Sequence, residues 1–368
     1  MKLENPIRFN TIISSILCLW LLSLIGCQSS PPSQPRNVIL IGWDGAQRNH
    51  VQECLARQEL PNLARLSGEG SLVAIDIYRT TDTKSGWSQI LTGYEPEITG
   101  VYSNGRYRPI PAGYTVFERL EEHFGPDNFV TVAVIGKKGH VDAAGPVKKK
   151  IKPAAESKSD QNENQAAQKT KKAGKKQAQG KAKRPEGKIV EENGVKYRVI
   201  PGKPYFHTKN NVDVFINGLI QDEKVGSKTL ELLEKYKDQP FFFFVHFAEV
   251  DHSGHRAGEN SLAYNDALIS ADTWTGRIMD KLLELGLYDE TLIYVTADHG
   301  FDEDQKGHKD APYVFLATND PLVRRRGERA DITPTILDRF GVDLPAIDPP
   351  LSGHSLLRAY QPPLWQAE

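Results

Sequence analysis

Residues 38–44 read VILIGWD, a run of apolar residues that ends in an acid. Two further apolar runs, residues 241–247 (FFFFVHF) and 292–295 (LIYV), lie far along the chain. Runs of this length without polar alternation are typical of strands that are buried on both faces of a sheet. Such strands belong to sheets that are mostly parallel and covered by helices. These stretches therefore predict an α/β fold with a central, mostly parallel sheet.

Acids and histidines follow each of these runs. Asp44 ends the first run, Asp251 and His255 follow the second, and Asp298 and His299 follow the third. In open α/β sheets the ligand site lies beyond the carboxyl ends of the strands, so we expect these side chains to share one pocket. Carboxylates and imidazoles together are ligands that zinc and similar divalent ions prefer. The sequence thus predicts a metal site at this edge of the sheet.

Apolar spacing also predicts the helices. Residues 261–287 carry apolar side chains at steps of three and four, which indicates a long amphipathic helix that ends near Gly286. Shorter patterns predict helices near residues 62–68, 86–91 and 331–340 and strands near residues 72–78, 129–135 and 313–317.

The N-terminus has the pattern of an export signal. Residues 11–26 are largely apolar, a length that suits a signal-peptide core and is short for a spanning helix. Residues 24–27, LIGC, resemble a bacterial lipobox, which implies cleavage before Cys27 and lipid on it. We therefore expect a signal peptide over residues 1–26, a membrane-anchored tether over residues 27–36, and an exported bacterial lipoprotein in the cell envelope, facing the periplasm or the cell surface. An ordinary signal peptide and an uncleaved anchor are the alternatives.

Length and cysteine content limit the architecture. The 368 residues suit one large domain or two modest ones. Of the three cysteines, Cys18 lies in the predicted signal peptide and Cys27 in the lipobox, which leaves Cys54 without a partner. We therefore expect no internal disulfide.

A basic, low-complexity segment, residues 147–187, interrupts the chain. From Lys148 to Lys188 there are 14 Lys and Arg residues against 4 Asp and Glu residues, with almost no bulky apolar side chain. Such a segment cannot offset the entropy of ordering it, so we expect a disordered insertion. A solvated loop is the plainer interpretation, and contact with an anionic surface such as lipid or polysaccharide is the alternative. Nucleic acid is not expected as a partner, because interleaved aromatic residues are missing.

A hydroxyl residue, Thr83, precedes the predicted helix at residues 86–91. A helix N-terminus offers unpaired N–H groups and the positive end of the helix dipole, which favour an anion such as phosphate. A threonine hydroxyl there becomes a nucleophile where a metal lowers its pKa. A threonine before a helix is more often only an N-cap, so this interpretation depends on the acids described above.

Five motifs occur in an order found in a known group of enzymes. They are VILIGWDG (38–45), TKSGWSQILTGYEPEITGVYSN (83–104), EVDHSGH (249–255), VTADHG (295–300) and GHKDAP (307–312). In this order they resemble the alkaline phosphatase superfamily, and in particular its type I phosphodiesterase/nucleotide pyrophosphatase branch. The resemblance implies one alkaline-phosphatase-like metallohydrolase domain that covers residues 37–368.

The resemblance also implies a site with two divalent metal ions, for which we expect zinc. The ligands of one ion would be Asp44, Thr83, Asp298 and His299. The ligands of the other ion would be Asp251, His255 and His308. Asn104 lies where this branch places a phosphate-contacting asparagine, so its amide and the Thr83 backbone N–H would stabilise charge on a phosphoryl oxygen.

Several histidines are left open by this assignment. His246, His252 and His354 are alternatives to His308, whose loop is acidic and of uncertain length. His140 and His207 flank the basic segment and are expected on the substrate side or in structural roles.

The resemblance implies hydrolysis of small-molecule phosphodiesters or related phosphate esters. Thr83 would attack phosphorus, and water would then hydrolyse the phosphothreonine. Sulfatases of this superfamily need cysteine or serine at that position, which disfavours sulfate esters. Lys84 stands where nucleotide-cleaving relatives place an aromatic residue. A cation there favours a second negative charge on the substrate, unless Lys84 simply faces solvent.

Alternatives remain on the same metal core. They are a phosphomonoesterase, a phosphonate hydrolase and a phosphoryl transferase. An alternative of another class is a non-catalytic lipoprotein that binds anionic polymers through the Lys-rich segment.

Overall fold

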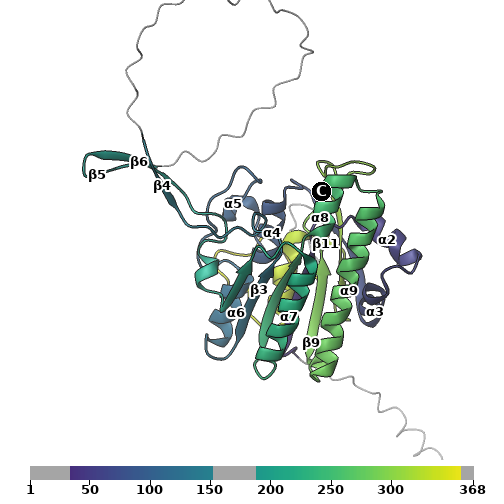
Figure 1. The fold of residues 1–368 in the computed structure, drawn as a ribbon. Helices are drawn as coiled ribbons and strands as arrows, with labels where there is room; N and C mark the ends of the chain where they lie inside the picture. The colour runs from purple at the N-terminus through teal and green to yellow at the C-terminus, as the bar shows by residue number, and fades with distance from the viewer. Residues whose placement is uncertain (1–33, 152–187, 358–368) are drawn as a thin grey trace, which may run out of the picture. The chain divides into compact units, whose positions relative to one another are not determined.

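The computed structural model describes residues 34–151 and 188–357 (Figure 1). The predicted signal peptide, the lipobox at Cys27 and residues 152–187 of the predicted insertion lie outside these ranges. Within them, no helix combines the length and apolar character that crossing a membrane requires.

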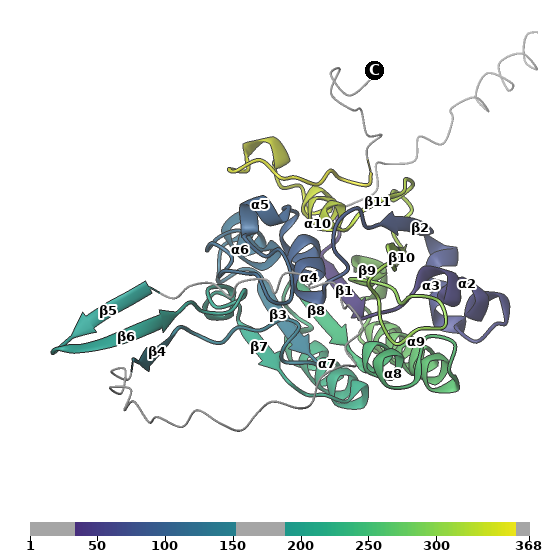
Figure 2. The ribbon, with the colours of Figure 1, turned by 90° about the horizontal axis from the view of Figure 1, so that it is seen from above.

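An eight-stranded sheet forms the centre of the described part of the chain (Figures 1 and 2). Its strands pair in parallel except at β10, which is antiparallel to both neighbours, β2 and β9. The prediction of a mostly parallel sheet is therefore confirmed. In spatial order the strands are β11 (Gly327–Glu328), β2 (Ser71–Asp76), β10 (Tyr313–Thr318), β9 (Thr291–Thr296), β1 (Asn37–Trp43), β8 (Phe241–Phe247), β3 (Val130–Ile135) and β7 (Val214–Asn217).

The strands formed by the first two apolar runs described above, β1 and β8, are neighbours inside this sheet. Every residue of both strands is buried, as expected for strands that are covered on both faces. Their register pairs Gly42 with His246. Gly42 has to lack a side chain, since a Cβ there would overlap the Trp87 ring. This close packing fixes the end of β1 and therefore the position of Asp44, which follows it.

Helices cover both faces of the sheet (Figure 2). α7, α8 and α9 pack together on one face, and α4, α6 and α10 pack together on the other. The helix predicted over residues 261–287 is α9, and Ser261 is its N-cap. The α-helices are α2 (Arg48–Ala56), α3 (Pro61–Glu69), α4 (Thr83–Thr92), α5 (Pro96–Thr99), α6 (Val116–Phe124), α7 (Asp222–Tyr236), α8 (Glu249–Ala257), α9 (Leu262–Glu284) and α10 (Ile332–Arg339). Short 3-10 turns are η2 (Thr208–Asn210), η3 (Tyr288–Glu290), η4 (Arg329–Asp331) and η5 (Leu344–Ala346).

The basic segment begins as ordered structure, which corrects one prediction. Disorder was expected from residue 147, but Val147–Lys150 form strand β4. This strand pairs with β6 (Val195–Ile200), which also pairs with β5 (Lys188–Glu192) in a second, antiparallel sheet. The backbone hydrogen bonds of β6 outweigh the low apolar content of β4.

Candidate active site

The predicted ligands gather where three neighbouring strands end. Asp44 follows β1, Asp298 and His299 come just after β9, and Asp251 lies in the first turn of α8, directly after β8. All four side chains are buried. Thr83 is the first residue of α4, whose N-cap is Asp82, so the helix begins three residues earlier than the sequence pattern indicated. Strand ends and a helix start therefore meet at one point, as the parallel topology requires.

One imidazole nitrogen, Nε2 of His299, lies at the centre of the first predicted ligand set. It is 3.1 Å from Thr83 Oγ1, 3.5 Å from Asp298 Oδ2 and 3.6 Å from Asp44 Oδ1. Ligands held about 2.0 to 2.2 Å from one tetrahedral ion lie roughly 3.3 to 3.6 Å apart. Thr83, Asp44 and Asp298 thus each lie at ligand spacing from His299, and the ligand atoms of Asp44 and His299 also lie close to that of Asp251.

The second predicted set lies directly beside the first. Asp251 Oδ1 is 3.1 Å from His255 Nε2 and 3.9 Å from His299 Nε2, so this oxygen faces both sets. The His308 ring stacks on His299 with centroids 3.8 Å apart, and Asp251, His255 and His308 can each direct one ligand atom to a common point. The geometry thus provides room for two adjacent ions.

Hydrogen bonds orient two of these imidazoles. His299 Nδ1 lies 2.9 Å from the Gly300 carbonyl oxygen, and His255 Nδ1 lies 2.9 Å from the Lys306 carbonyl oxygen. A carbonyl can only accept, so both Nδ1 atoms carry the proton and both Nε2 atoms present a lone pair toward the carboxylates. Burial and then His308 lower the pKa of His299 to about 4, which keeps its ring neutral and able to bind a cation.

Several ligand atoms in this pocket have no hydrogen-bond partner among the described residues. They are Asp44 Oδ1, Asp251 Oδ1, Asp298 Oδ2 and His308 Nδ1. Burial, and then the charges of Asp44 and Asp251, raise the pKa of Asp298 well above its ordinary value. Unpaired buried carboxylate oxygens are costly, and cations remove that cost. The donor set therefore fits divalent metal ions.

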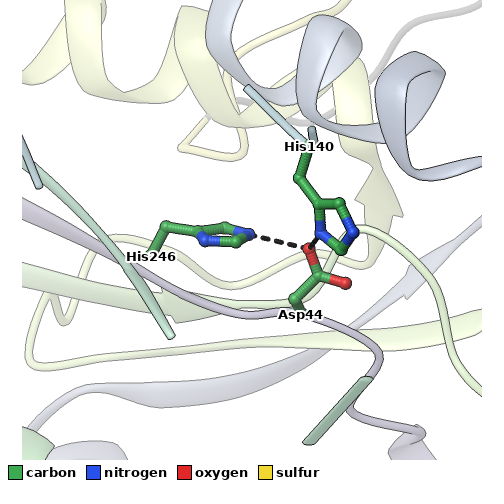
Figure 3. A group of neighbouring side chains, drawn as sticks. All are labelled: Asp44, His140 and His246. Carbon is green, nitrogen blue, oxygen red and sulfur yellow. Dashed lines mark hydrogen bonds and ion pairs between the residues drawn. The ribbon is translucent and has the colours of Figure 1, made fainter. Parts of the chain in front are cut away.

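Asp44 is held by three donors that the sequence reasoning did not connect with it, and Figure 3 shows two of them, His140 and His246. Its Oδ2 lies 2.6 Å from His140 Nδ1, 2.7 Å from His246 Nε2 and 2.9 Å from Trp87 Nε1. These bonds occupy Oδ2 and leave Oδ1 directed at the predicted metal position. A histidine inside the otherwise apolar β8 was the available signal, because a buried polar group needs a partner.

Lys137 and Arg329 also reach the site. Lys137 Nζ lies 2.8 Å from Asp251 Oδ2, whereas His255 and His299 lie near the other oxygen, Oδ1. The Arg329 guanidinium is buried and donates to the Asp298 carbonyl at 2.7 Å and to the Thr80 carbonyl at 2.8 Å. Burial lowers the pKa of Arg329 only to about 10, so it remains charged at neutral pH. It ties the loop before α4 to the segment that follows β9.

Asn104 lies near the start of α4, on an exposed loop. Its amide oxygen accepts a hydrogen bond of 3.0 Å from the Lys84 backbone N–H. This bond leaves the amide N–H₂ group available beside the N-terminus of α4. The Lys84 ammonium lies 5.7 Å from the centre of the Tyr107 ring. Burial, and then Lys203, lower the pKa of Lys84.

The remaining histidines lie elsewhere. His252 is exposed on α8, His207 packs against Phe206, and His354 lines a separate cavity with Arg325. His246 contacts Asp44 and is turned away from the second set. Among the described histidines, His308 is therefore the one that joins Asp251 and His255.

Comparisons with known proteins identify the family of the chain. Residues 38–335 match the family model described as type I phosphodiesterase / nucleotide pyrophosphatase. A 2,3-bisphosphoglycerate-independent phosphoglycerate mutase from Syntrophotalea carbinolica is 32% identical over 124 residues, which cover 31% of this chain and 22% of that protein. The chain thus spans well under half of the length of this curated relative.

Solved structures share the fold at low identity. The lipoteichoic acid synthase LtaP from Listeria monocytogenes has a TM-score of 0.54 at 15% identity, covering 89% of this chain and 76% of that one. The phosphonate monoester hydrolase SpPMH from Silicibacter pomeroyi has a TM-score of 0.52 at 15% identity, covering 87% and 75%. The family match covers most of the described body, including β1, α4, β8 and β9. The chain belongs to the type I phosphodiesterase / nucleotide pyrophosphatase family.

Proposed function

We propose that this protein hydrolyses phosphodiesters or related phosphate esters, with Thr83 as the nucleophile. The observation that carries the proposal is the position of the Thr83 hydroxyl. It starts α4 and lies 3.1 Å from His299 Nε2, beside carboxylates with unpaired oxygens. A hydroxyl in this setting is close enough to a bound cation to lose its proton readily.

Two divalent ions, which we propose to be zinc, would be held by the two ligand sets. The first set is Asp44, Thr83, Asp298 and His299, and the second is Asp251, His255 and His308. Divalent ions at these positions supply charge that lowers the pKa of the threonine hydroxyl and stabilises the phosphoryl oxygens. The neutral His299 ring and the fixed Nε2 lone pairs of His255 and His299 support this assignment.

Each protein group has its own role in the proposed reaction. Thr83 Oγ1 forms the new bond to phosphorus as the alcohol departs, and water later cleaves the phosphothreonine. The Asn104 amide N–H₂ and the Thr83 backbone N–H would donate to the phosphoryl oxygen that gains charge. Lys137 and the donors on Asp44 Oδ2 keep the carboxylates in place throughout.

A threonine substitution tests the proposal. We expect the zinc-loaded full chain to cleave a bis-aryl phosphate and the Thr83→Ala variant to lose at least about 10³-fold in kcat, since the covalent route is removed. Thr83→Ser is the matched control and should retain part of the rate. Wild-type turnover by Thr83→Ala, or no release of aryl alcohol by the wild type, contradicts the proposal.

The cation at Lys84 favours a second candidate, a phosphomonoesterase. A terminal phosphate carries an additional negative charge, and Lys84, the residue directly after Thr83, offers a cation that could bind it. Faster cleavage of an aryl monophosphate than of the matching diester by the same preparation would move the protein to this class.

The proposed setting is the cell envelope. We propose that lipid on Cys27 anchors the protein to a membrane and that the basic segment, Lys148–Lys188, contacts an anionic surface. Mass spectrometry of the purified protein tests the first point, because lipidation changes the mass of the N-terminal peptide. Deleting residues 152–187 tests the second, since catalysis by the metal site should survive while membrane or polymer binding weakens.

A further inference from the structure

Three lysine ammonium groups lie close enough to repel one another near the start of α4. Lys84 belongs to α4, Lys137 follows β3, and Lys203 follows β6. Lys137 is paired with Asp251, and Lys203 lies 3.8 Å from the Asp142 carboxylate. Among the described residues, no carboxylate lies within 4.0 Å of the Lys84 ammonium. Asp82 and Asp142 attract the Lys84 ammonium from farther away, so Lys84 is the one of these three lysines that has no direct carboxylate partner within the described ranges.

Tyr107 brings two of these lysines to one place. The ammonium of Lys84 lies 5.7 Å from the ring centre, and that of Lys203 lies 5.2 Å from it. Lys203 Nζ is also 2.6 Å from the Tyr107 hydroxyl oxygen, so it sits at the hydroxyl end of the ring. Because an ammonium can only donate, the hydroxyl accepts this bond and keeps its own proton for another acceptor. Two cations and a free O–H donor are thus gathered around one side chain.

The loops that carry these groups are joined to each other by backbone hydrogen bonds. The Lys203 N–H donates to the Ala144 carbonyl at 2.8 Å, and the Ile110 N–H donates to the Pro204 carbonyl at 2.8 Å. The Lys84 N–H is held by Asn104, as described above. The donors are therefore positioned before any ligand arrives, although two like charges near one ring repel each other. A bound anion relieves that repulsion.

We infer that Lys84, Lys203 and Tyr107 bind a second anionic group of the substrate, a carboxylate or a phosphate next to the phosphate that is cleaved. This inference rests on the proposed function, because it names the substrate class of the same site. The scissile phosphate already has its own donors in Asn104 and the start of α4. The substrate class is a phosphodiester in which one of the two alcohols carries an acidic group.

Three diesters with one leaving group test the inference. Each releases p-nitrophenolate, and the retained ester group is phenyl, 4-carboxyphenyl or 4-phosphonooxyphenyl. We expect the zinc-loaded full chain to cleave the two charged diesters with kcat/KM at least about tenfold above that for the phenyl diester, as charge-assisted hydrogen bonds predict. The ratio should fall as ionic strength rises. A preference for one charged diester identifies the source of the anion as carboxylate or phosphate and supports the inference.

Variants assign the effect to these residues. Lys84→Gln and Lys203→Gln should each lower the charged-to-neutral ratio by about tenfold. Lys235→Gln is the matched control, because it also removes an exposed lysine. Lys235 lies in the last turn of α7, which leads into the start of β8, at the edge of the sheet opposite the site. Calorimetric binding to the Thr83→Ala protein gives a second readout, in which the charged diesters should bind more tightly and the Lys84→Gln/Thr83→Ala double variant should lose that difference.

Each contrary result has a separate meaning. Equal cleavage of all three diesters by the wild type overturns the inference and leaves the proposed function standing. Equal losses on neutral and charged diesters in Lys84→Gln also overturn it, since they assign the lysine to the scissile phosphate. Absence of Thr83-dependent cleavage of every diester overturns the proposed function itself.

Discussion

Neighbouring side chains determine both the orientation and the charge of the Asp44 carboxylate. Trp87, His140 and His246 occupy Oδ2, so that only Oδ1 is free toward the predicted ion. Burial by itself raises the pKa of Asp44, but the bonds and charges of His140 and His246 outweigh it and hold the pKa well below the ordinary value. The carboxylate is therefore ionised over the whole neutral range.

Removing one donor from Asp44 should weaken metal binding. We expect His246→Leu to raise the dissociation constant for zinc by about 10- to 100-fold, the usual effect of losing a group that orients a ligand. His246→Gln keeps an N–H donor and should recover most of the affinity. Competition with a chelator measures both, and equal zinc affinity in His246→Leu and wild type would contradict this role for His246.

His50 provides a prediction about pH. It is buried and lies 2.7 Å from Glu259. Burial lowers the pKa of His50, but bonds with Cys54 and Glu259 outweigh it and raise the pKa to about 10 from its ordinary 6.5. Stabilisation by the ion pair is therefore complete below pH 6.5 and is lost as the pH rises toward 10.

Denaturant unfolding of the wild type and His50→Gln tests this effect. Between pH 6.5 and pH 10 the wild type should lose about 1 to 2 kcal/mol more free energy of unfolding than the variant. If the free energy of unfolding changed with pH by the same amount in both proteins, the His50–Glu259 ion pair would be ruled out as the source of the pH dependence.

At the scale of elements, α4 determines where the nucleophile lies. Its first residue is Thr83, and one turn later Gly86 packs directly on the segment after β9. A Cβ on Gly86 would lie 2.8 Å from Asp298 Cβ and 2.9 Å from Arg329 Nη1. This contact sets the spacing between the threonine and the ligands of the first predicted ion.

Adding a methyl group at that contact should disturb catalysis. We expect Gly86→Ala to cost about 1 to 3 kcal/mol in stability through overpacking and to lower kcat by about 10²-fold, because the helix start has to shift. Gly68→Ala in α3 is the matched control, since nothing lies within 4 Å of a Cβ there and a helix interior favours alanine. Thermal unfolding and initial rates measure both variants, and normal activity in Gly86→Ala would refute this role for the contact.

At the scale of the whole molecule, the sheet edge concentrates negative charge in a buried place. Asp44, Asp251 and Asp298 meet there, and the charges of the first two, added to burial, keep the pKa of Asp298 well above normal. At pH values above the ordinary carboxyl pKa, the raised pKa of Asp298 therefore lowers the stability of the folded protein without metal. Bound cations remove this destabilisation.

Removing the metal should therefore lower the stability of the fold. Zinc at 100 times its dissociation constant should stabilise the fold by about 2.7 kcal/mol per site, and a chelator should reverse the effect. Asp298→Asn should unfold at a higher temperature than metal-free wild type yet gain less from zinc. Differential scanning calorimetry measures both, and an identical melting temperature with zinc and with chelator would exclude a metal that stabilises the fold.

Much of this architecture follows from the sequence by itself. The apolar runs at β1, β8 and β9 determine buried parallel strands, because only a doubly covered sheet accepts them. The same topology brings the acids after these strands to one edge. The motif order also predicted that Thr83 and the six Asp and His ligands share one pocket, and the structure brings these residues together.

Only the tertiary structure decided the surroundings of these groups. His140 is 96 residues from Asp44 and His246 is 202 residues from it, so no local pattern connects them. Lys203 reaches Tyr107 in the same way, across a separation of 96 residues. Strand formation at Val147–Lys150 likewise depends on β6, a partner that lies beyond the basic segment. Periodicity and motif order predict the position of a residue within its own helix, strand or motif. Contacts between distant loops depend instead on how the elements pack against one another.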